Sequence, residues 1–164
     1  MNEKEMEILG ILEENARASI STIADMVELE EQEVSDIIKF LEDKNIILNY
    51  QAVINWDHTP VNNGVTAMID VKVAPKREIG FDGVAERIYR FPEVKAVYLM
   101  SGAYDLSVQI EGKTMKEVAF FVSKKLSTLD SVLSTTTHFL LKKYKHDGVI
   151  FEPEQKDKRA VVSP

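Results

Sequence analysis

The chain contains no cysteine, which excludes a disulfide framework, a thiolate metal site and a cysteine nucleophile. None of its apolar runs approaches the roughly 20 residues that a membrane-spanning helix needs, so we expect no membrane partner. The opening residues, MNEKEMEILG, have neither the basic start nor the apolar stretch of a signal peptide. These absences predict a soluble, cytoplasmic protein.

Patterns typical of catalysis and of metal binding are also missing. The three histidines, His58, His138 and His146, are far apart and show no ligand spacing such as H-x-x-x-H. The glycines of REIGFDGVAE do not form a phosphate-binding loop, and no serine lies in a nucleophile-elbow pattern. We therefore expect no enzyme activity, no catalytic residue, no cofactor and no metal site.

Positive charge is scarce in the first third of the chain. Residues 1–55 hold 4 Lys and Arg against 13 Asp and Glu, a formal balance of −9. Residues 56–164 hold 16 against 14, a balance of +2. This asymmetry predicts two units with different partners. By composition alone the acidic unit is unfavourable for DNA binding, because Lys and Arg contacts to phosphate supply most of the affinity.

Residues 1–54 nevertheless have the pattern of a winged helix-turn-helix domain. Apolar residues recur at helical spacing in three short segments. They are Ile8, Leu9, Ile11 and Leu12, then Ile20, Ile23, Ala24 and Val27, then Val34, Ile37, Ile38 and Leu41. Ser19 and Ser21 are suitable N-caps for the second helix. Residues 46–55, IILNYQAVIN, are rich in β-branched and aromatic side chains and predict an extended strand or wing.

Residues 55–63, NWDHTPVNN, gather turn-forming residues and predict a linker. Over residues 64–147 the pattern predicts strand, helix, strand, strand, helix and strand, the last strand being long and covering VLSTTTHFLLKKYK. That strand places Thr135, Thr137, Phe139 and Leu141 on one face.

This order predicts the α+β class and a ferredoxin-like βαββαβ domain, in which two helices cover one face of an antiparallel sheet. Wherever the other face is apolar it needs a partner, which favours a dimer. Residues 148–164 are left as a C-terminal tail.

The chain resembles the leucine-responsive regulator/AsnC family of bacterial and archaeal transcription factors, from Met1 to about Phe151. In the first unit the resemblance rests on ILGILEENARASISTIADMV, VSDIIKFLEDKNII and NYQAVIN. In the second it rests on RFPEVKAVYLMSGAYDLSV and STTTHFLL. The resemblance implies an ACT-like (RAM) second domain, homodimers joined through it, often four dimers in an octameric ring, and an amino-acid effector bound between dimers.

Two departures from the family concern DNA contact. Family members usually carry Gly-Leu-Ser before the third helix, where this chain has Glu28, Leu29 and Glu30. Glycine suits a positive φ there and serine caps the helix, and glutamate serves neither purpose well. Arginine is usual just after the valine of the third helix, where this chain has Asp36 and Ile37.

The third helix still carries side chains that can read bases. Gln can bridge adenine N6 and N7, Asp can accept from cytosine N4, and Ser contacts many base edges. Arg17, at the position where the family usually has arginine, can hold phosphate. We therefore expect double-stranded DNA as a partner. The predicted DNA-binding residues are Arg17, Gln32, Ser35, Asp36, Lys39 and Lys44.

The turn SGAYD is the candidate effector site that the resemblance implies. Asp105 can accept from an ammonium group, and the backbone N–H groups of Gly102 and Ala103 can donate to a carboxylate. A plain hairpin turn is the alternative reading of the same residues. The candidate effector-binding residues are Ser101, Gly102, Ala103, Tyr104, Asp105, Thr135 and Thr136.

The combined prediction is an amino-acid-responsive, DNA-binding transcriptional regulator. One alternative is an effector-binding oligomer whose acidic winged helix contacts a protein instead of DNA. Another is an enzyme similar to those relatives that decarboxylate a haem precursor with basic side chains and histidine. The turn SGAYD contains neither Arg nor His, which disfavours the enzyme.

Overall fold

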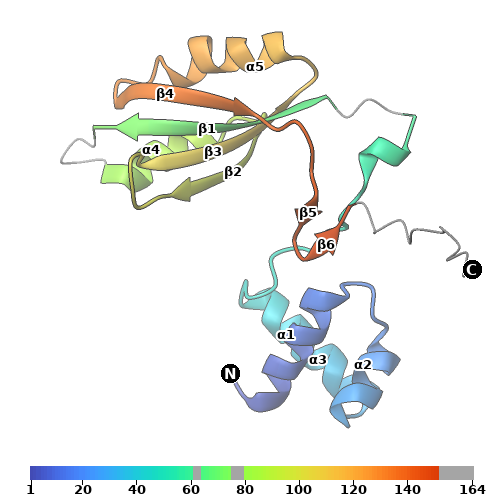
Figure 1. The fold of residues 1–164 in the computed structure, drawn as a ribbon. Helices are drawn as coiled ribbons and strands as arrows, with labels where there is room; N and C mark the ends of the chain where they lie inside the picture. Colours follow the sequence, from blue (N-terminus) through green and yellow to red (C-terminus); the bar gives the residue numbers. More distant parts are fainter. Residues whose placement is uncertain (61–63, 75–79, 152–164) are drawn as a thin grey trace, which may run out of the picture. The chain divides into compact units, whose positions relative to one another are not determined.

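The computed structural model describes residues 1–60, 64–74 and 80–151. The chain divides into two compact units, Met1–Ile54 and Asn55–Pro164 (Figure 1). Among the described residues, no helix has the length and apolar character needed to cross a membrane.

Three helices form the N-terminal unit: α1 (Glu3–Glu14), α2 (Ile20–Val27) and α3 (Glu31–Asp43). Helix α2 begins where Ser19 accepts a hydrogen bond from Thr22 N, so Ser19 and not Ser21 is the N-cap. The buried side chains lie at the predicted helical spacing and pack in one cluster. They are Ile8, Ile23, Ala24, Val27 and Val34.

The predicted strand over residues 46–55 is wrong for this chain. Within the described residues, the segment belongs to no strand pair. Its first residues instead close α3, because the N–H groups of Ile46 and Ile47 donate to Leu41 O at 2.9 and 3.2 Å. The Tyr50 hydroxyl donates to Glu42 Oε1 at 2.9 Å. A β-rich composition forms a strand only where another strand supplies hydrogen bonds, which local sequence does not reveal.

The C-terminal unit has the predicted βαββαβ order. It contains β1 (Val65–Val73), α4 (Gly80–Tyr89), β2 (Val94–Leu99), β3 (Leu106–Gly112), α5 (Met115–Phe121) and β4 (Val132–Phe139). The four strands form one antiparallel sheet in the order β2-β3-β1-β4. This arrangement confirms the α+β class and the ferredoxin-like topology.

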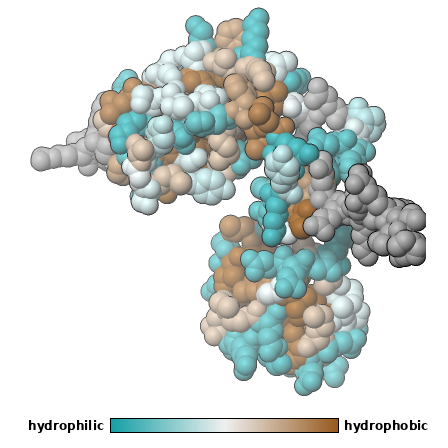
Figure 2. All heavy atoms as spheres, viewed as in Figure 1, coloured by the Kyte–Doolittle hydropathy of each residue, from teal (hydrophilic) through white to brown (hydrophobic). Residues whose placement is uncertain are grey.

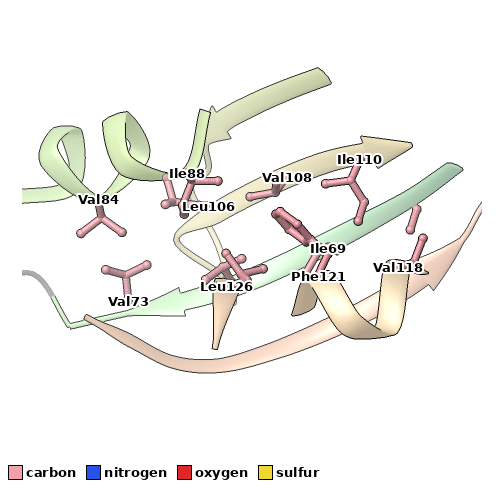
Figure 3. Close-up of a cluster of buried hydrophobic side chains, with 12 residues drawn as sticks. Ile69, Val73, Val84, Ile88, Leu106, Val108, Ile110, Val118, Phe121 and Leu126 are labelled. Carbon is pink, nitrogen blue, oxygen red and sulfur yellow. The ribbon is translucent and has the colours of Figure 1, made fainter. Parts of the chain in front are cut away.

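Helices α4 and α5 cover one face of this sheet (Figure 3). Alternate residues of β1 and β3 point toward them, and those from Ala67 to Val73 and from Leu106 to Ile110 are buried. The sheet contributes Ala67, Ile69, Val71, Val73, Leu106, Val108 and Ile110 to the core, and the helical layer contributes Val84, Ile88, Val118, Phe121 and Leu126. Each fully buried Val, Leu, Ile or Phe side chain contributes about 1.5–3 kcal/mol to the stability of the folded unit.

The other face of the sheet is largely polar. Its β1 positions are Thr66, Met68, Asp70 and Lys72, and His138 Nε2 on β4 lies 3.0 Å from Asp70 Oδ2. Exposed hydrophobic side chains lie instead toward the edge strands. They are Tyr98 and Leu99 on β2 and Leu133 on β4.

The predicted end of the last strand also needs correction. Strand β4 ends at Phe139, and Leu141 is 90% exposed beyond it, so Leu141 does not share the face of Thr135. A short hairpin follows, formed by β5 (Lys145–His146) and β6 (Val149–Ile150). The last predicted tail residues, 152–164, lie outside the described part of the chain.

Candidate DNA-binding and effector sites

The outer face of α3 carries three of the predicted DNA-reading side chains. Gln32, Asp36 and Lys39 are exposed, whereas Ser35 is half-buried. Gln32 Nε2 donates to Asp36 Oδ1 at 3.1 Å, one helical turn away. These two groups must therefore exchange their mutual hydrogen bond for contacts to bases if they read DNA.

The turn between α2 and α3 keeps helix-turn-helix geometry without the residues that usually support it. Glu28 has φ 55° and ψ 48°, the left-handed conformation that favours glycine. Glu30 is the N-cap of α3, and its N–H donates to Glu33 Oε2 at 3.2 Å. Glu30 and Glu33 thus form a capping box, in which the Glu30 side chain in turn accepts from the backbone of Glu33.

The basic side chains that are predicted to contact phosphate include two near the ends of the helices. Arg17 is exposed between α1 and α2, where its backbone N–H donates to Asn15 Oδ1 at 3.1 Å. Lys44 is the C-cap of α3, with Nζ 5.8 Å from the centre of the Phe40 ring. Figure 2 shows hydrophobic side chains among the hydrophilic ones on the visible face of the N-terminal unit.

The turn between β2 and β3 is held by one side chain and two backbone groups of the neighbouring strand β1. Asp105 Oδ2 accepts from Val73 N at 2.8 Å and lies 3.7 Å from Lys72 Nζ. The same Lys72 Nζ donates to Ala103 O at 3.2 Å. Asp105 N donates to Val71 O at 3.1 Å. Asp105 therefore already fixes the end of β1, in addition to any contact it makes to a ligand.

Sequence reasoning missed Lys72 as a part of this site. The signal was present, because alternation along β1 places Lys72 on the polar face, at the end of the strand. Its partners Ala103 and Asp105 lie 31 and 33 residues later, and only the register of the sheet brings them together.

The other candidate effector residues are divided between two faces of the sheet. Ser101, Gly102 and Ala103 are exposed, and Tyr104 is half-buried. Thr135 pairs with Val71, whose side chain is in the core, so Thr135 faces the helices. Thr136 pairs with Asp70 and faces the open side. The two threonines therefore cannot line the same side of one pocket.

No cluster of three His, Cys, Asp or Glu side chains that could hold a metal ion occurs among the residues that the structure describes.

Comparison with known families assigns each unit to a family. Residues 1–47 match the family described as winged helix-turn-helix DNA-binding, and residues 66–150 match the Lrp/AsnC ligand binding domain. The chain is 63% identical over 164 residues to an uncharacterized HTH-type transcriptional regulator, YugG, of Bacillus subtilis strain 168, covering 100% of this chain and 99% of that protein. It is 30% identical to the HTH-type transcriptional regulator LrpA of Pyrococcus abyssi, covering 88% and 99%.

A crystal structure of a transcriptional regulator of Neisseria meningitidis in complex with L-Met is also similar. It has 26% identity and a TM-score of 0.71, and the alignment covers 89% of this chain and 93% of that one. The similar proteins are transcriptional regulators and not enzymes, which confirms the expectation of a non-enzyme and gives the decarboxylase alternative no support.

Proposed function

Because the chain belongs to the Lrp/AsnC family of DNA-binding transcriptional regulators, we propose that its ligand-binding domain senses a free amino acid at the turn between β2 and β3. The regulator is a homodimer that assembles further into an octamer, and it acts in the cytoplasm, where its operator DNA lies. Effector binding between dimers alters the assembly and so the spacing of the DNA-binding units.

The observation that supports an amino-acid effector is the pairing of Lys72 with Asp105. Their charged atoms lie 3.7 Å apart, and the Lys72 side chain is 44% exposed. Opposite charges placed side by side match a zwitterion, whose carboxylate takes donors and whose ammonium takes acceptors. Exposed Gly102 adds a backbone N–H without a side chain to hinder approach. The similar regulator of Neisseria meningitidis, crystallised with L-Met, supports the same ligand class.

Calorimetric titration with the twenty amino acids tests this site. Lys72→Met removes the donor, and we expect affinity for the effector to fall at least tenfold. Lys95→Met is the matched control, because Lys95 forms a similar ion pair with Glu111 at 3.7 Å, away from the turn. Equal losses in the two variants would mean that the turn is not the effector site.

We assign operator reading to the outer face of α3 and phosphate contact to Arg17, Lys39 and Lys44. Fluorescence anisotropy on the DNA upstream of the protein's own gene, against a scrambled sequence and across a salt series, tests this assignment. Arg17→Gln should reduce the salt slope by about 0.9 if it contacts one phosphate. Arg90→Gln, an exposed arginine of the C-terminal unit paired with Glu86, should leave the slope unchanged.

A second candidate function, binding of a basic protein by α3, rests on the formal balance of −9 in residues 1–55. The same anisotropy series separates the two. Salt-dependent preference for the protein's own upstream DNA excludes the protein partner, and absence of DNA binding at every salt concentration, with and without amino acids, favours it.

A further inference from the structure

The residues that follow the sheet, 140–151, form a short basic hairpin. Strand β5 pairs with β6. The pairing extends one step further, because Phe151 N donates to Tyr144 O at 3.0 Å. The strands are joined at Asp147 and Gly148, whose φ angles are 45° and 77°. Positive φ at both central residues is typical of the tight type I′ hairpin turn, so the segment has a defined shape of its own.

The excess of positive charge in the C-terminal unit comes from this hairpin. Residues 140–151 hold three Lys and one Asp, a formal balance of +2, whereas the remainder of residues 56–164 holds 13 side chains of each sign. Lys145 is exposed and Lys143 is half-buried. Neither lysine forms an ion pair with any residue that the structure describes. Asp147, the acid of the hairpin, lies 3.5 Å from His146 Nε2.

An aromatic side chain lies among these lysines along the chain. Tyr144 is 69% exposed, and the Nζ of Lys142 lies 5.0 Å from the centre of its ring. The ring therefore attracts one ammonium group to the surface of the hairpin. Lysine ammonium groups and tyrosine hydroxyls are both donors that contact the phosphate oxygens of DNA. The composition of the hairpin thus suits a phosphate backbone.

The hairpin is attached to the segment that leads into the N-terminal unit (Figure 1). Asn55 Nδ2 donates to Phe151 O at 3.1 Å, and Phe151 is only 8% exposed. Asn55 directly follows Ile54, the last residue of the N-terminal unit. This hydrogen bond therefore fixes the base of the hairpin to the residue at which the chain enters the DNA-binding unit.

The N-terminal unit lacks what the hairpin offers. Residues 1–55 have a formal balance of −9. The segment predicted as a wing, residues 46–55, pairs with no strand in the described part of the chain. Affinity for DNA comes largely from phosphates neutralised by Lys and Arg. A DNA-binding unit with few such side chains gains most from phosphate contacts that another part of the same protein supplies.

We propose that the hairpin of residues 140–151 is a second DNA-contacting surface, on which Lys143 and Lys145 hold phosphates of the duplex that α3 reads. These contacts add affinity without sequence preference, because phosphate groups carry no sequence information. The inference rests on the DNA binding proposed above for the N-terminal unit.

Fluorescence anisotropy of the full chain across a salt series tests the hairpin, on the DNA upstream of the protein's own gene and on a scrambled sequence. The double variant Lys143→Gln/Lys145→Gln removes two phosphate contacts. The slope of log K against log salt should therefore fall by about 1.8 for each subunit on the DNA. Affinity for the two DNAs should fall by the same factor, because phosphate contacts do not distinguish them.

The matched control is Lys116→Gln/Lys124→Gln, in helix α5 and the turn that follows it. Both lysines are exposed, and Lys116 Nζ also lies over an aromatic ring, 5.6 Å from the centre of Phe120. The control removes the same charge from the same unit and should leave the slope unchanged. Equal falls in the two double variants would assign the effect to net charge and overturn the proposal.

Contact between copies of the chain is the competing explanation, because Val149 and Ile150 on β6 are also exposed. Sedimentation velocity distinguishes the two, and we expect both double variants to keep the assembly mass of the parent chain. A smaller assembly in the hairpin variant alone would overturn the proposal in favour of an interface between copies.

Arg17→Gln separates the failure of the hairpin from the failure of DNA binding itself. If the slope falls in Arg17→Gln and stays at the parent value in the hairpin variant, the hairpin does not contact DNA and the function proposed for the N-terminal unit stands. If the parent chain binds neither DNA at any salt concentration, with or without amino acids, both proposals are wrong.

Discussion

The turns at the two candidate sites, Glu28–Glu30 in the N-terminal unit and Ser101–Asp105 in the C-terminal unit, are stabilised in different ways. The first is closed by local backbone hydrogen bonds, such as Leu29 N to Ala24 O at 3.1 Å, and it forces a glutamate into the left-handed region. The second is fixed by contacts to residues of β1 that lie 31 and 32 residues earlier along the chain.

This difference teaches where each turn is vulnerable. The first turn depends on what its own residues tolerate, so residues better suited to its backbone conformation should improve stability. The second depends on a partner strand, so substitutions should reduce stability. Amide hydrogen exchange of buried residues reports the free energy of unfolding of each unit separately and suits a chain of two units.

The largest effect is expected at Asp105. Asp105→Ala leaves the part-buried Val73 N–H without its acceptor, and we expect the C-terminal unit to lose about 2 kcal/mol of unfolding free energy. Exchange of the β1 and β3 amides measures this loss. Asp105→Asn is the control, because its amide oxygen can still accept from Val73 N. Equal stability of the alanine and asparagine variants would show that the hydrogen bond is not what holds this turn.

Glu28 comes next, with the opposite sign. Glu28→Gly removes the Cβ that disfavours the left-handed region, at the expense of greater freedom in the unfolded chain. We expect a net gain of about 0.5–1 kcal/mol in the N-terminal unit, measured by exchange of the Ile23 and Val27 amides. Glu28→Ala keeps the Cβ and should bring no such gain. If the glycine variant were no more stable than the alanine variant, backbone strain at Glu28 would not be what limits the stability of this turn.

A similar or smaller gain is expected at the N-cap of α3. Glu30→Ser replaces the glutamate of the capping box by serine, a preferred N-cap residue whose shorter side chain can accept from the N–H of Glu33. The expected gain is about 0.5–1 kcal/mol, measured on the same amides. Glu31→Ser makes the same chemical change one residue later, within the first helical turn, and should not stabilise the unit. If the two serine variants behave alike, capping is not the cause.

The smallest effect on stability is expected at Lys72. Its ion pair with Asp105 is 44% exposed on the lysine side, so Lys72→Met should cost only about 0.2–1 kcal/mol of unfolding free energy. The same variant is expected to lose at least tenfold in effector affinity. It therefore distinguishes a role of Lys72 in stabilising the turn from a role in binding the ligand. A stability loss as large as that of Asp105→Ala would mean that Lys72 is mainly structural.

The predictions from sequence were most accurate where the signal repeats along one element. The helical stripes, the cap at Ser19 and the alternation along β1 all agree with the structure, because each depends on residues a few positions apart. The strand expected at residues 46–55 failed, because pairing depends on a neighbour that composition does not specify. The extent of β4 was overestimated for the same reason.

The candidate effector site was only partly accessible to this reasoning. The turn itself was found from its residues and from the family resemblance. That Thr135 and Thr136 face opposite sides follows from their pairing with Val71 and Asp70. Lys72 was not found, since its contacts with the turn cross between strands.

By itself the sequence determined the three N-terminal helices, the βαββαβ order of the second unit, the division of charge between the two units and the family. Each of these depends on local periodicity, on composition or on motif order, which a linear chain displays directly. Only the tertiary structure decided that Lys72 meets Asp105 and that Lys125 meets Glu93. These depend on strand register and on the packing of α5 against the sheet, which bring together side chains that the sequence keeps about thirty residues apart.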